Sequence, residues 1–441
     1  MAATGAGSPR SSYGRGARIL SVGIATTGVV TLAYFALAAQ VLTGVQYTHI
    51  SLVWSIMFVV ASVIYRPIEQ LLSRTIADRR ARGQSSGGGH LRIALLIQAA
   101  FAVTFLGAAL AARDLLQNEL FDGSSDLYWV LVVGVLAYAA SYFARGFLAG
   151  HQRFGLYGAL VFVEAVSRVC FALAVVVGIA SGQTAVALGM AAAPFVSLVV
   201  VPLYFARREQ DPPVDPAAVT ETEGGLTLRR GAGFAVSVLA VMVAEQTLLN
   251  AAVLTVKGTS PDPELAGVVF SVLLIARAPL QLFQAVQGSL LPHLAGLEAT
   301  AGREEFGRAI RVTVLAITGF ATAVAVGLFA VGPPVVRAAF QIDQPLGRAG
   351  LALVGVGMGC HLAAGTLNQA ALARGQASAA ACAWLLSAGL FIAFMLSPLV
   401  GDQLLRAEAG YFGAAALLCA LLTVLYRGGG RRAAAPAPAP A

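Results

Sequence analysis

Residues 157–180 read YGALVFVEAVSRVCFALAVVVGIA, and Glu164 and Arg168 are the only charged residues in this stretch. About 20 apolar residues are enough to cross the hydrocarbon core of a bilayer as an α-helix. A helix is expected because a segment in lipid must satisfy its backbone hydrogen bonds internally. The stretch therefore predicts a membrane-spanning helix that carries two opposite charges.

The rest of the chain has the same apolar character. Of its 441 residues, 58% are hydrophobic and 11% are charged, whereas a soluble domain carries about a quarter charged residues. We therefore predict an all-α polytopic membrane protein with about twelve transmembrane helices, since the apolar residues fall into blocks of spanning length. The predicted spans are residues 19–40, 49–72, 91–112, 127–148, 157–180, 185–205, 231–256, 265–291, 309–331, 349–372, 377–398 and 409–426.

The positive residues are distributed unevenly between the two sides of the membrane. If both termini are cytoplasmic, 22 Arg and Lys residues fall on the cytoplasmic side and 5 on the outer side. Cytoplasmic loops are enriched in positive residues, so this distribution predicts a multi-pass protein of the cytoplasmic membrane with both termini inside. The net charge of +8 then follows from topology, and no nucleic-acid partner is expected.

A polar segment rich in Pro, Gly and acidic residues divides the chain near its middle, at residues 206–230. Such a composition is typical of a linker. It separates a predicted N-lobe at residues 19–205 from a predicted C-lobe at residues 231–426. We expect a cytoplasmic arm at residues 1–18 and a disordered Ala/Pro tail at residues 427–441.

Three short motifs occur in the same order in both halves. They are Arg15-Gly-Ala and Arg230-Gly-Ala before the first helix, Arg66-Pro and Arg277-Ala-Pro in the second, and turns ending at Gln152 and Gln376 after the fourth. Each half has an even number of predicted spans, so the halves would be parallel repeats. Such an architecture predicts a cavity between two six-helix lobes that opens alternately to either side.

Two arginines that correspond in this repeat are the main candidates for substrate binding. Arg66 and Arg277 both fall within predicted spans, where a charged side chain is costly and usually functional. Each is followed closely by a proline, which kinks a helix. We predict that both line the cavity and bind an anion such as phosphate. In the alternatives, Arg66 reaches the cytoplasmic surface and Arg277 pairs with Glu245, which could itself bind H⁺ or Na⁺.

Other polar residues in the spans have two interpretations. Glu164 and Arg168 are four residues apart and can pair on one helix face, either as a self-neutralised structural pair or as part of a cavity lining. Asn250, Gln281 and Gln284 either line the cavity or bond to neighbouring helices. Gly355-x-x-x-Gly359 predicts close helix packing.

Enzyme signatures are absent from the chain, which contains no HExxH, GxSxG or GxxxxGK[ST] motif. The four cysteines lie in apolar blocks and lack metal-ligand spacing. We therefore expect no catalytic residue, no bound metal and no cofactor.

Several of these motifs match a known family. Arg66-Pro67, the run from Arg145 to Gly158 and the segment from Arg277 to Pro292 resemble the multidrug/oligosaccharidyl-lipid/polysaccharide (MOP) exporter superfamily. The branch resembled is that of the Wzx-like polysaccharide biosynthesis flippases. The resemblance implies two six-helix lobes around a cationic cavity, and export of a polyprenyl-pyrophosphate-linked sugar or oligosaccharide. It further implies that Arg66 and Arg277 bind the pyrophosphate.

The expected partners follow from this interpretation. They are the lipid-linked glycan, H⁺ or Na⁺ as a coupling ion, membrane lipids and other proteins of cell-envelope biosynthesis. The main alternative is an ion-coupled multidrug exporter of the MATE type. A membrane enzyme acting on polyprenyl-linked sugars and a non-transporting scaffold protein are further alternatives.

Overall fold

The computed structural model describes residues 26–81, 89–206, 228–275, 280 and 302–432. Within these ranges the chain is helical and contains no β-strand. Ten of the helices are long and apolar enough to cross a membrane. The prediction of an all-α, multi-pass membrane protein is therefore confirmed.

The ten spanning helices coincide with ten of the predicted spans, within a few residues at most ends. Two shorter apolar helices, Thr26–Val41 and Leu265–Ile275, overlap the predicted spans 19–40 and 265–291. The remaining parts of those two spans lie largely outside the described residues.

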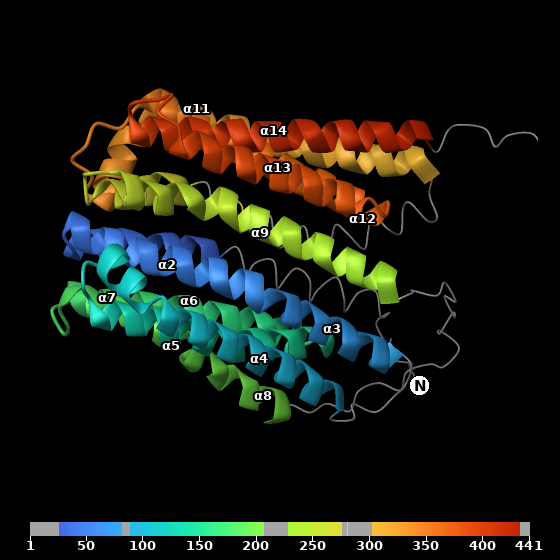
Figure 1. Cartoon of the computed structure of the whole chain (residues 1–441), viewed down its shortest axis with the longest axis horizontal. Helices are drawn as coiled ribbons and strands as arrows, with labels where there is room; N and C mark the ends of the chain where they lie inside the picture. The colour runs from blue at the N-terminus through green and yellow to red at the C-terminus, as the bar shows by residue number, and fades with distance from the viewer. Residues whose placement is uncertain (1–25, 82–88, 207–227, 276–279, 281–301, 433–441) are drawn as a thin grey trace, which may run out of the picture. The chain divides into compact units, whose positions relative to one another are not determined.

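The chain divides into two compact units, Met1–Gly225 and Leu226–Ala441 (Figure 1). The main helices of the first unit are α2 (Gly44–Ile64), α3 (Arg66–Ala81), α4 (Gly89–Ala111), α5 (Ser125–Gly150), α6 (Phe154–Val176), α7 (Gly182–Ser197) and α8 (Val201–Ala206). A short π-helix, Leu115–Leu120, precedes α5, and a 3₁₀ turn, Leu198–Val200, precedes α8. The second unit contains α9 (Leu228–Thr259), α11 (Gly302–Phe340), α12 (Arg348–Ala373), α13 (Ala377–Leu396) and α14 (Gln403–Arg432).

One helix forms the centre of each unit. Within an apolar 18-residue stretch of each helix, 72% of the residues are buried in α5 and 78% in α12. The buried share is only 17% in α4 and in α11. Helix α5 packs against α2, α3 and α7, and helix α12 packs against α11 and α14. Helices α5 and α12 each correspond to the fourth predicted span of their half, and each lies at the centre of its unit.

Glycines bring each central helix close to a neighbour. A methyl group added at Gly355 of α12 would lie 3.0 Å from the Cα atom of Ala325 in α11, and one added at Gly359 would collide with Ala321. Small residues of this kind let helix backbones approach closely in membranes. The predicted close packing of the Gly355-x-x-x-Gly359 motif is confirmed. Helix α5 uses Gly146 in the same way, against the backbone of Glu69 in α3.

The two central helices also end in the same turn. After α5, the amide N–H groups of Gln152 and Arg153 donate to the carbonyl oxygens of Ala149 and Leu148. After α12, those of Gly375 and Gln376 donate to Leu372 and Ala371. This is the Schellman arrangement, in which a left-handed residue closes the helix, here with φ 56° at Gln152 and φ 70° at Gly375. The turns that the sequence repeat placed in correspondence therefore share one backbone geometry, in which Gln152 is equivalent to Gly375, one residue away from the sequence match of Gln152 with Gln376.

Two helices extend beyond their predicted ends. Helix α11 runs from Gly302 to Phe340 and includes Pro333 and Pro334, beyond the predicted span 309–331. Hydropathy ends a span where charged residues begin, but the helix continues through them, with Glu304 and Arg308 paired one turn apart at 3.7 Å. Helix α14 runs to Arg432, past the predicted boundary at residue 426.

We expect Gly355→Val to lower the stability of the protein by about 1–3 kcal/mol, because the larger side chain would push α11 away from α12. The measurement is the thermal unfolding midpoint of the purified protein in detergent. Gly327→Val in α11 is the matched control, since a Cβ atom there meets nothing within 4 Å. Equal midpoints for the two variants would contradict the packing role of Gly355.

Candidate functional site

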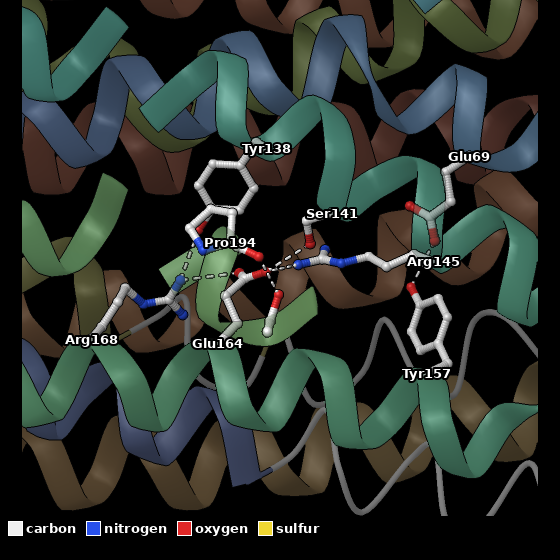
Figure 2. A network of polar contacts seen from close by, with 9 residues as sticks. Glu69, Tyr138, Ser141, Arg145, Tyr157, Glu164, Arg168 and Pro194 are labelled. Carbon is white, nitrogen blue, oxygen red and sulfur yellow. Dashed lines mark hydrogen bonds and ion pairs between the residues drawn. The ribbon is translucent and has the colours of Figure 1, made fainter. Parts of the chain in front are cut away.

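A buried carboxylate binds two arginines inside the first unit (Figure 2). Glu164 of α6 accepts hydrogen bonds through Oε2 from Arg145 Nη2 at 2.6 Å and from Ser141 Oγ at 3.0 Å, both on α5. Its Oε1 atom accepts from Arg168 Nη1 at 3.2 Å, one turn further along α6. The predicted pairing of Glu164 with Arg168 therefore occurs, but as part of a larger cluster.

Aromatic side chains surround the two guanidinium groups. Arg168 Nη1 also donates to the hydroxyl of Tyr138 at 2.8 Å, and its guanidinium carbon lies 4.9 Å from the ring centroid of Trp54 in α2. The guanidinium carbon of Arg145 lies 4.6 Å from the ring centroid of Tyr142. Such cation–π contacts stabilise a cation that has lost its water. Residues of α2, α5 and α6 thus build the cluster together.

The cluster carries more positive than negative charge. Glu164, Arg145 and Arg168 are 3%, 9% and 2% exposed, and two guanidinium groups face one carboxylate. The Nε atoms of both arginines are buried and have no hydrogen-bond partner among the described residues. A buried charge is costly unless it is paired. Glu69 of α3 also interacts electrostatically with Arg145, and Arg66 with Glu69, so the wider cluster of three arginines and two carboxylates has an excess of one positive charge.

Arg66, one of the two arginines predicted to bind the substrate, lies at a break between two helices. Helix α2 ends at Ile64, and α3 begins at Arg66 just before Pro67, so the chain changes helix at the predicted proline site. Arg66 is half-buried and has an interaction partner. One turn along α3, Glu69 Oε1 accepts a hydrogen bond from the hydroxyl of Tyr157 in α6 at 2.7 Å, as Figure 2 shows.

The candidates in the second half are only partly described. Glu245 lies in α9, half-buried, with an interaction partner. Asn250 is 2% exposed, and its side-chain nitrogen donates to the carbonyl oxygen of Gln246, four residues earlier, at 3.0 Å. Arg277, Gln281 and Gln284 lie outside the described residues. The pairing of Arg66 with Arg277 across one cavity therefore stays a prediction.

Two buried charged residues were missed by sequence reasoning. Arg145 was counted among the cytoplasmic arginines because it lies near the end of a predicted span. In the second unit, Glu408 of α14 is 2% exposed and packs against Gly350 of α12; it fell one residue before the predicted span 409–426. His361 of α12 is 2% exposed, with both ring nitrogens unpaired among the described residues. No cluster of His, Cys, Asp and Glu in the described ranges could hold a metal ion.

The chain is similar in sequence to known proteins. Residues 13–220 match the family described as polysaccharide biosynthesis protein. The uncharacterized protein Rv1510 of Mycobacterium tuberculosis is 27% identical over 358 residues, which cover 78% of this chain and 76% of that protein.

Solved structures of similar fold cover nearly the whole chain. The inward-facing conformation of a multidrug resistance MATE family transporter of the MOP superfamily aligns with a TM-score of 0.65 at 13% identity, covering 94% of this chain and 97% of that one. A MOP superfamily transporter from Pyrococcus furiosus, described as having a binding pocket of reverse polarity that suggests a different function, aligns with a TM-score of 0.64 at 14% identity. That alignment covers 97% and 96% of the two chains. The resemblance predicted from the sequence is thus confirmed: the chain has the fold of MOP superfamily transporters, and residues 13–220 match the polysaccharide biosynthesis protein family.

Proposed function

We propose that this protein flips a polyprenyl-pyrophosphate-linked sugar or oligosaccharide across the cytoplasmic membrane, for polysaccharide or cell-envelope biosynthesis. The single observation that carries the proposal is the charge of the buried cluster, in which Arg145 and Arg168 share one carboxylate, Glu164. The match of residues 13–220 to the polysaccharide biosynthesis protein family supports the same function. Both termini would lie in the cytoplasm, since this orientation places most arginines inside.

The chemistry of the cargo explains why the charge matters. A pyrophosphate group carries negative charge, and arginine binds phosphate oxygens through paired N–H donors. An excess positive charge in a region of low dielectric attracts an anion strongly and repels a cation. The arrangement around Glu164 therefore favours an anionic substrate over a cationic drug.

In this proposal the buried pair Arg145 and Arg168 has a different role from Arg66 and Arg277. Arg145 and Arg168 are both hydrogen-bonded to Glu164 and lie near aromatic rings, so they provide a fixed positive potential. Arg66 is half-buried at the α2–α3 break, where a proline-interrupted helix can line a cavity. In the proposed mechanism Arg66 and Arg277 bind the pyrophosphate directly, and rocking of the two halves exposes them to each side in turn.

Glu245 is the proposed coupling residue. A carboxylate within a membrane span can bind H⁺ or Na⁺ and so link cargo movement to an ion gradient. The alternative function is ion-coupled export of cationic drugs, and one solved structure that shares this fold is a multidrug resistance MATE family transporter. The two functions predict different cargoes for the same purified protein in liposomes.

We expect Arg66→Ala and Arg277→Ala each to reduce flipping of a lipid-linked oligosaccharide by at least about tenfold, because each would remove a charge-assisted contact to the pyrophosphate. The measurement is flipping in proteoliposomes, with an organic cation as the competing cargo. Arg308→Ala is the control, since its side chain is 73% exposed. Parent-level flipping by both variants would remove the assignment, and transport of the cation alone would favour the drug exporter.

We expect Glu164→Gln to lower stability by about 3–5 kcal/mol, because it would leave two buried guanidinium groups without a carboxylate. Adding Arg145→Gln to this variant removes one of those charges and should restore part of the loss. Thermal unfolding of the single and double variants in detergent measures both effects. Glu304→Gln, on an exposed pair, is the control, and a Glu164→Gln protein as stable as the parent would refute the charge argument.

We expect Glu245→Gln to allow flipping that no longer depends on an ion gradient, because the amide cannot bind H⁺ or Na⁺ as a carboxylate does. The test imposes a pH or Na⁺ gradient across proteoliposomes and compares initial rates for the variant and the parent. Unaltered gradient dependence would show that Glu245 is not the coupling residue.

A further inference from the structure

Helices α13 and α14 enclose an apolar groove within the second unit. Phe391 and Phe394 of α13 line one wall, and Gly410, Gly413 and Leu417 of α14 line the other. Its volume is about 500 Å³, including the part that is open to the surroundings. Because both helices are membrane spans, the open side of the groove faces either lipid or other parts of the protein, and its lining suits a hydrocarbon chain.

Two glycines give the groove its depth. A Cβ atom at Gly410 would lie 2.9 Å from the ring of Phe394, so a larger residue there would close the groove at this level. At Gly413 a Cβ atom would meet nothing within 4 Å, which means that the space beside it is open. Any side chain placed at residue 413 would therefore enter the groove without displacing the backbone.

An arginine lies about one helical turn beyond the groove lining, next to Met395. Arg406 precedes Gly410 and Gly413 by four and seven residues, a spacing that places all three on the same face of α14. Its guanidinium group donates through Nε at 2.8 Å and through Nη2 to the carbonyl oxygen of Val400, and through Nη1 at 3.3 Å to that of Met395. These bonds hold the group at the α13–α14 turn, beside the Phe394 end of the groove, and use three of its five N–H donors.

The charge of Arg406 is not neutralised locally. In the part of the chain that the structure describes, no carboxylate oxygen lies within 4.0 Å of its guanidinium. Asp402, one turn earlier, instead accepts hydrogen bonds from the backbone N–H groups of Leu404 and Leu405 and so caps α14. An arginine with two N–H donors left over at a membrane turn has the chemistry to bind a phosphate oxygen.

The length of the groove indicates which lipid it accepts. The lining on α14 runs from Ala409 to Leu417, a rise of about 12 Å at about 1.5 Å per residue, and Arg406 lies about 4–5 Å beyond it. Half of the hydrocarbon core of a bilayer is about 15 Å thick. A phospholipid of one leaflet would thus place its headgroup at Arg406 and one acyl chain along the whole groove, whereas a polyprenyl chain would be too long for it.

We propose that the α13–α14 groove is a binding site for an anionic phospholipid, with the phosphate on Arg406 and an acyl chain against Phe391, Phe394 and Gly413. The site is independent of the cargo site proposed above. It would bind a lipid of the leaflet that contains the α13–α14 turn and so hold the two helices together at that end.

Native mass spectrometry of the full-length protein tests this proposal. The probes are phosphatidylglycerol and phosphatidylcholine with identical acyl chains, and undecaprenyl phosphate. We expect the parent to bind phosphatidylglycerol about fivefold more than phosphatidylcholine, from one interfacial arginine. Arg406→Gln should abolish this preference, and Gly413→Leu should reduce the occupancy of both phospholipids.

Two further variants are controls that separate loss of lipid binding from misfolding. Arg406→Lys keeps the charge and should keep the preference for phosphatidylglycerol, whereas loss of the preference would contradict a role for charge. Gly389→Leu, on α13 at a position where a Cβ atom meets nothing within 4 Å, should bind like the parent. Parent-like occupancy in Gly413→Leu, or stronger binding of undecaprenyl phosphate than of phosphatidylglycerol, would overturn the proposal.

Discussion

The ion cluster around Glu164 is the constraint on which the first unit depends. In hydrocarbon the carboxylate and the two guanidinium groups can remain charged only while they stay in contact. The contacts join α5 to α6 through Arg145 and join α6 to α2 through Arg168 and Trp54. Displacing α5 from α6 would separate buried charges, and displacing α2 would take the Trp54 ring away from Arg168, so these contacts favour movement of the three helices as one body. The alternating access proposed above, by rocking of two halves, requires rigid units of this kind.

Close packing has the same effect in the second unit by a different means. There the central helix α12 is joined to α11 through Gly355 and Gly359, and no ion pair within the described part of that interface plays the role of Glu164. Backbone proximity and dispersion hold these helices, as is common where lipid leaves no hydrophobic driving force between helices. The two units thus reach a similar central-helix arrangement with different chemistry at its core.

The sequence predicted the fold far better than the site. Hydropathy alone located the spanning helices, because lipid imposes helical structure on long apolar segments. The pairing of Glu164 with Arg168 followed from their four-residue spacing. The contributions of Arg145, Tyr138 and Trp54 did not, because no local spacing rule connects residues on different helices. Arg145 and Glu408 were also hidden by span boundaries, which hydropathy sets only to within a few residues.

The Schellman turns after α5 and α12 bear on how the two halves diverged. Gly375 adopts the left-handed conformation without penalty, whereas Gln152 holds it with a side chain, at about 1–2 kcal/mol. The first turn therefore forms without glycine, among contacts such as those of His151 with Phe147 and Tyr204. If the halves arose by duplication, backbone geometry has outlasted amino-acid identity as the record of common ancestry, and a search for internal repeats by residue matching would undercount them.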